Sequence, residues 1–138
     1  MIDKKTKKAS SEKEFNISLS NIELYSINGQ QLKCDLTKGP FQLTRNNFLD
    51  IHGLEGNLLK IKLSEKLFFK PEGPFKLDLD IIGTYEIDEN TLKEDIEKVL
   101  EDLAQPLFSY ASLIIAIMTE KFASLPIIVP PVKSEETD

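Results

Sequence analysis

The sequence of 138 residues has no tryptophan, one histidine and one cysteine. A lone cysteine, Cys34, permits no disulfide within the chain, which fits the reducing cytoplasm. With His52 as the only histidine, a serine or cysteine nucleophile has one candidate partner. Asp50 and His52 could act as two zinc ligands from one strand face, but a zinc site needs three or four and the sequence specifies no third candidate. The glycines at 53 and 56 lack the spacing and the lysine of a phosphate-binding loop. We therefore expect no enzyme activity, metal or cofactor.

Basic charge and long apolar runs are also scarce. The chain has 17 lysines and arginines against 23 aspartates and glutamates, and this net charge of −6 argues against nucleic acid, because phosphate binding needs a basic face. The run of residues 106–119, which holds no charge, is shorter than the about 20 apolar residues of a membrane span. Residues 1–14 carry lysines but no apolar core, which predicts a disordered basic tail. One domain is expected over residues 15–132, followed by a polar tail over 133–138.

Alternation of apolar and polar residues predicts the first strand. Phe15, Ile17 and Leu19 alternate, and the parity changes at Ser20 and Asn21, which predicts a bulge there. Asn28-Gly29 and Gly39-Pro40 predict turns. Residues 30–56 predict short strands or an irregular edge, with Cys34 in the core and His52 in a turn.

The clearest strands flank a Pro-Glu-Gly-Pro turn. Residues 59–69 and 75–87 each place apolar side chains on one face and charged side chains on the other, which predicts a long antiparallel hairpin. Two pairings of these strands keep their apolar side chains on one face, and they set Lys66 opposite Asp78 or opposite Asp80. The sequence therefore predicts an antiparallel sheet of about four strands with one apolar face.

The apolar period becomes helical after residue 90. Thr91 and Glu94 form a capping-box pattern, and Pro106 predicts a break, a kink or the start of a new helix. The run 106–119 is apolar all round, so one sheet cannot cover it. A homo-oligomer, a dimer or tetramer, is predicted to bury the excess, and a surface left open for apolar partners is the alternative. The interface residues are Leu113, Ile114, Ile117 and Met118.

Residues 122–132 are apolar but contain prolines at 126, 130 and 131, which exclude a helix and disfavour a central strand. The segment is therefore predicted to be extended, either as one wall of a groove for an extended peptide or as a tail that seals the core. The fold class is α+β: the sheet, then a long kinked apolar helix, then the proline-rich extended segment.

The run Leu107-Phe108-Ser109-Tyr110-Ala111, followed by Leu125-Pro126 and Pro131-Val132, resembles the SecB export-chaperone family. The resemblance covers residues 15–132 and is specific in sequence over 106–132. It implies a homotetrameric, ATP-independent holding chaperone that keeps precursors unfolded and passes them to the translocation motor SecA; some relatives guard toxin–antitoxin partners. In the family a second helix and a motor-binding tail follow the Pro-Val pair, whereas six residues follow Val132 here, and Ser109 stands where the family tends to have proline. The resemblance thus implies the fold more directly than the handover to SecA.

The apolar residues of the proline-rich segment and the resemblance together place the binding of unfolded polypeptide clients on Phe122, Leu125, Ile127 and Ile128. Asp78, Asp80 and Glu86 on the charged sheet face are the candidate docking site for SecA, partly neutralised by neighbouring lysines. A second function remains open, a non-chaperone oligomeric adaptor or small-ligand-binding protein with a helix on a sheet.

Overall fold

A computed structural model describes residues 16–35, 37, 40–123 and 127–133. The predicted basic tail and all but the first residue of the predicted polar tail lie outside these residues. Within them the chain forms four strands and then three helices, in agreement with the α+β prediction. The elements are β1 (Ile17–Gln31), β2 (Gln42–Glu55), β3 (Leu58–Lys70), β4 (Phe75–Ile87), α1 (Lys93–Lys98), α2 (Leu100–Leu103) and α3 (Gln105–Ala123).

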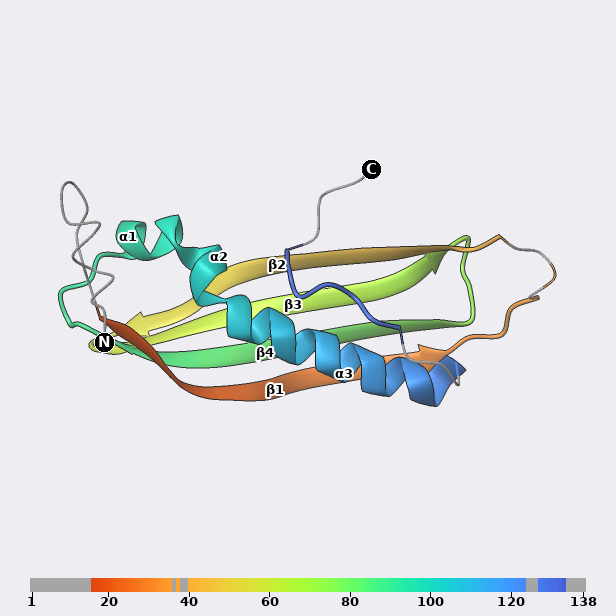
Figure 1. The fold of residues 1–138 in the computed structure, drawn as a ribbon, viewed down its shortest axis with the longest axis horizontal. Helices are drawn as coiled ribbons and strands as arrows, with labels where there is room; N and C mark the ends of the chain where they lie inside the picture. Colours follow the sequence, from red (N-terminus) through yellow and green to blue (C-terminus); the bar gives the residue numbers. More distant parts are fainter. Residues whose placement is uncertain (1–15, 36, 38–39, 124–126, 134–138) are drawn as a thin grey trace.

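The four strands form one antiparallel sheet in the order β1-β4-β3-β2. Helix α3 lies across one face of this sheet, which we call the inner face, and residues 127–132 lie over the same face on the β2 side (Figure 1). The core fills the space between the inner face and α3. Its fully buried members include Leu59, Ile61, Leu63, Phe75, Leu77, Ile81, Leu107, Phe108 and Ile115.

The predicted hairpin is present as β3 and β4. Lys66 pairs with Asp78 in the register, and the Lys66 Nζ and Asp78 Oδ1 atoms are 4.0 Å apart. Both side chains are about half exposed, so this pair helps to select the register and adds little stability.

Strand β1 is longer than expected. The bulge predicted near Ser20 is confirmed by a register shift between Leu19 and Asn21, and a second shift surrounds Tyr25. The turn predicted at Asn28-Gly29 was wrong, because both residues continue β1 opposite β4. Gly29 serves packing instead: a Cβ atom there would lie 2.8 Å from Cε2 of the Phe122 ring. The end of α3 thus sits directly on the strand.

Strand β2 occupies most of the stretch for which only short strands were expected. His52 lies within β2 at a register shift between Ile51 and Gly53, so the predicted turn there was wrong. The turn to β3 is Gly56-Asn57 instead, with Gly56 at a φ of 60° that favours glycine. Cys34 was expected in the core, but it is only half-buried, because the chain leaves the sheet after Gln31.

The helices begin at other residues than predicted. The capping box does not form: Leu92 is the N-cap of α1, and the Thr91 hydroxyl donates a hydrogen bond to the Asp88 carbonyl. Pro106 is the second residue of α3 and therefore starts a new helix, where its missing N–H has no intrahelical partner to lose.

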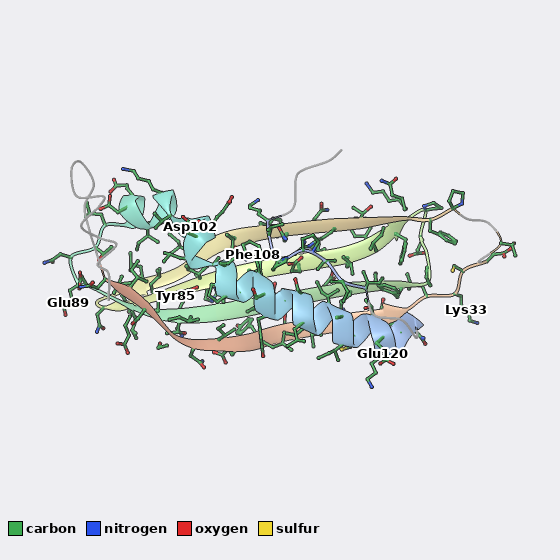
Figure 2. All side chains as sticks on the ribbon, in the orientation of Figure 1. Lys33, Tyr85, Glu89, Asp102, Phe108 and Glu120 are labelled. Atoms are coloured by element: carbon green, nitrogen blue, oxygen red, sulfur yellow. The ribbon has the colours of Figure 1, made fainter. Side chains whose placement is uncertain are left out.

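Two contacts on β4 fix the beginning of α3. A Cβ atom at Gly83 would lie 2.7 Å from Cδ2 of Leu107, so the glycine lets the helix approach the sheet closely. The Tyr85 hydroxyl donates a 2.6 Å hydrogen bond to the Leu103 carbonyl, and burial raises the pKa of Tyr85 to about 12. Phe108 lies near this end of α3 and Glu120 near the other (Figure 2).

The sheet covers only one side of α3. Leu113 and Ile117 remain 57% and 50% exposed on the opposite side. None of the helices in the described ranges is long and apolar enough to cross a membrane.

Candidate client-binding surface

Residues 127–132, which we call the C-terminal segment, run between α3 and β2 without forming a helix or a strand, and the chain bends at Pro131 and Val132 (Figure 1). Their side chains divide between the core and the solvent. Val129 is buried and Ile127 packs against the core, whereas Ile128 is 75% and Val132 48% exposed. The segment therefore seals part of the core and also presents apolar side chains to the solvent.

Side chains of α3 bind the main chain of the C-terminal segment. The Ser112 hydroxyl donates a 2.9 Å hydrogen bond to the Val129 carbonyl, and Gln105 Nε2 donates one of 2.6 Å to the Pro131 carbonyl. The Ile127 N–H donates a 2.7 Å bond to the hydroxyl of Thr119, which is fully buried. One edge of the segment is thus fixed along the helix.

Strand β2 binds the other edge of the segment. Arg45 Nη1 donates a 2.7 Å hydrogen bond to the Pro130 carbonyl, and Asn47 Nδ2 donates one of 3.3 Å to the Val132 carbonyl. Arg45 is held by two bonds of 3.0 and 2.8 Å to the carboxylate of Glu65, which is 2% exposed and also accepts a 3.3 Å bond from Asn47. The buried charge is therefore paired and hydrogen-bonded, as burial requires.

The sequence prediction missed this polar cluster. Glu65 has the same parity as the buried apolar residues of β3. The alternation in the sequence thus already placed a carboxylate on the core face, and this could have revealed the cluster. Arg45 is the only arginine of the sequence, and a buried carboxylate calls for such a partner. Neither residue belonged to the predicted site.

The structure separates the four predicted client-binding residues. Phe122 was expected in the extended segment, but α3 continues to Ala123, and the half-buried Phe122 ring stacks on Phe75 with centroids 5.7 Å apart. Leu125 lies outside the described residues. Ile127 faces the core and Ile128 faces the solvent, so Ile128 is the predicted residue best placed to contact a client.

The four predicted interface residues also differ in exposure. Leu113 and Ile117 point to solvent, while Ile114 and Met118 are half-buried and pack against the core. Exposed apolar side chains also occur on β1, among them Leu24. Assembly through this side of the molecule stays a prediction.

Asp78, Asp80 and Glu86 all lie on the outer face of β4. Asp80 accepts hydrogen bonds from the hydroxyls of Ser26 on β1 and Ser64 on β3, at 3.0 and 2.7 Å. Asp78 faces Lys66, and Glu86 is exposed. Two of the three carboxylates thus have partners within the sheet. Within the described ranges no group of three histidines, cysteines or carboxylates is placed to hold a metal ion.

The two outer strands differ in regularity. The pairing of β2 with β3 is unbroken from Gln42 to Ile51, whereas β1 is interrupted by two register shifts. Bulges disturb the ladder and hinder the addition of a further strand. In the described part of the chain, β2 has no partner on its other side, so it offers the more regular free edge.

No family model matches this sequence, and no curated protein matches it. Solved structures that share its fold include the following two. The Mycobacterium tuberculosis Rv1957 SecB-like chaperone, solved in complex with a ChAD peptide from the Rv1956 HigA1 antitoxin, is 11% identical with a TM-score of 0.65, over 85% of this chain and 88% of that one. A protein of unknown function from Streptococcus agalactiae is 12% identical with a TM-score of 0.54, over 86% and 99%. The chain therefore has the SecB-like chaperone fold, and the resemblance drawn from its sequence is confirmed at the level of the fold.

Proposed function

We propose that this protein is an ATP-independent holding chaperone that binds unfolded polypeptides through apolar contacts and strand-like pairing. The fold supports a chaperone role, because the Mycobacterium tuberculosis protein that shares it is a SecB-like chaperone solved with a peptide from an antitoxin. Unfolded chains expose the two features that such a surface needs, apolar side chains and unpaired main-chain groups.

The observation that carries the proposal is the position of Ile128 and Val132. Both apolar side chains stand in solvent on a segment that is bonded to β2 through Arg45 and Asn47. The strand that carries Arg45 and Asn47, β2, also has the regular free edge of the sheet. A client in extended conformation could pair with this edge while its side chains contact Ile128 and Val132, and neither contact requires a particular client sequence.

An aggregation assay tests the proposal. A chemically unfolded model protein is diluted into buffer without ATP, with this protein at a stoichiometric ratio, and light scattering is followed. We expect suppression of aggregation, which an unrelated acidic protein at the same concentration does not produce. No suppression even at large excess contradicts the chaperone proposal and favours the adaptor or ligand-binding alternative.

Export is the finer part of the proposal. We propose a cytoplasmic location, which a lone cysteine fits, and SecA as a partner, which the resemblance to the SecB family implies, with Asp78, Asp80 and Glu86 as the docking face. Since Asp78 and Asp80 are engaged within the sheet, Glu86 is the carboxylate most available to a partner. Binding of purified SecA should weaken in Glu86→Lys, and an unchanged affinity would contradict docking on this face.

A further inference from the structure

We propose that Arg45, Gln105 and Ser112 are positioning residues for client binding, which hold the C-terminal segment so that Ile128 stays in the solvent. This inference rests on the proposed chaperone function and adds to it the device that shapes the binding surface. None of the three side chains needs to touch a client.

The C-terminal segment lacks the hydrogen bonds that normally keep an extended chain in place. Pro130 and Pro131 have no N–H group, so they cannot donate to a strand. Among the described residues the segment forms no ladder with a strand, and the backbone–backbone bond that it makes is internal, from the Val132 N–H to the Pro130 carbonyl. Its conformation therefore depends on side chains of its neighbours.

Those side chains bind three consecutive carbonyl groups from alternating sides. Ser112 on α3 binds the carbonyl of residue 129, Arg45 on β2 binds that of residue 130, and Gln105 on α3 binds that of residue 131. Donors on both sides at successive positions fix the direction of the main chain. They consequently fix which side chains face inward, as Val129 does, and which face outward, as Ile128 does.

The Arg45 guanidinium is itself held in a fixed position. Its guanidinium is bidentate to Glu65, whose carboxylate is buried and also bonded to Asn47. A planar fork held in this way leaves its remaining donors aimed in one direction, here at the Pro130 carbonyl. Because the segment is already ordered in the free protein, client binding does not have to offset the entropy cost of ordering it.

Gln105→Ala and Ser112→Ala test the inference, because they remove two of the bonds and leave the buried Arg45–Glu65 pair intact. The affinity for a permanently unfolded, carboxymethylated protein should fall about two- to tenfold for each bond removed. Hydrogen exchange at the Ile127 amide should become faster, while the melting temperature changes little. Ser109→Ala is the matched control, since Ser109 is an exposed serine of the same helix, and it should change none of these values.

A double-mutant cycle with Ile128→Ser separates positioning from a general loss of stability. If the two donors act by presenting Ile128, their removal should have almost no further effect on affinity in the Ile128→Ser background. Wild-type protein that binds no client refutes the proposed function itself. If wild-type protein binds clients but Gln105→Ala and Ser112→Ala bind them equally well, or leave exchange at Ile127 unchanged, the positioning role is refuted and the chaperone function stands.

Discussion

The two adjacent isoleucines of the C-terminal segment face opposite ways, so replacing them one at a time should give opposite results. Ile128 is 75% exposed, whereas Ile127 packs against the core. We predict that Ile128→Ser weakens client binding with little loss of stability. Ile127→Ser should instead destabilise the fold. Replacing both residues together would mix the two effects.

The exposed fractions give the expected magnitudes. Burying an isoleucine side chain fully stabilises by about 1.5–3 kcal/mol. Only a quarter of Ile128 is covered in the free protein, so Ile128→Ser should cost about 0.4–0.8 kcal/mol of unfolding free energy, or about 1–4 °C in melting temperature. A client that covers the rest would lose about 1–2 kcal/mol of binding free energy, which corresponds to about 5- to 30-fold weaker binding. Ile127→Ser should lower the unfolding free energy by about 2 kcal/mol.

Melting temperature and client affinity are measured on the same preparation of each variant. Leu58→Ser is a matched control, because Leu58 is an exposed apolar residue at the start of β3, away from the segment. If Ile128→Ser binds clients with wild-type affinity, Ile128 is not part of the client-binding surface. If it melts more than about 8 °C lower, the side chain is buried in solution and the reasoning from exposure fails.

Size exclusion with light scattering should give the mass of a dimer or tetramer, and the double variant Leu113→Asp with Ile117→Asp should dissociate it, because the interface is expected to bury both exposed side chains. A measured wild-type mass of 15.6 kDa, that of a monomer, would contradict this assembly. Gly29→Ala should lower the unfolding free energy in urea by about 1–3 kcal/mol, since the new methyl group meets the Phe122 ring, and an unchanged midpoint would show that the ring moves freely. Burial raises the pKa of Tyr85 from 10.0 to about 12, so the fold favours the neutral phenol, and the wild type should lose stability as the pH rises from about 10 to 12. Tyr85→Phe should lack this alkaline loss, and identical pH profiles would place the ionisation elsewhere.

The sequence predicted the elements whose side chains obey a simple period. Strands β3 and β4 alternate at most positions, because one face packs on the core and the other is largely polar. Only short strands were expected where β2 lies, because polar Arg45 and Asn47 occupy inner-face positions, where they bind the C-terminal segment rather than fill the core. Apolar–polar alternation fails to reveal a strand where a side chain on the inner face is polar and binds a residue far away in the sequence.

The candidate site was predicted only in part for a related reason. The prediction that an apolar segment outside helix and strand follows α3 was correct, but its inward and outward residues depend on where α3 ends and which of its carbonyls the neighbouring side chains bind. The sequence placed Phe122 in the segment, whereas the space above Gly29 accepts its ring and allows the helix to continue. The outward position of Ile128 follows from these long-range contacts, which periodicity does not encode.

The sheet order has a consequence for biosynthesis. β1 leaves the ribosome first, yet its hydrogen-bonding partner is β4, the last strand to be made. β2, β3 and β4 are joined by short turns and can pair as soon as each emerges, while closing the long loop from β1 to β4 carries a greater entropy cost and is slow. Leu19, Leu24 and Ile27 on β1 therefore stay without a partner strand until the meander is complete. A nascent chain of this protein therefore exposes an apolar strand without a hydrogen-bonded partner. This is the kind of segment that the folded protein is proposed to bind in its clients.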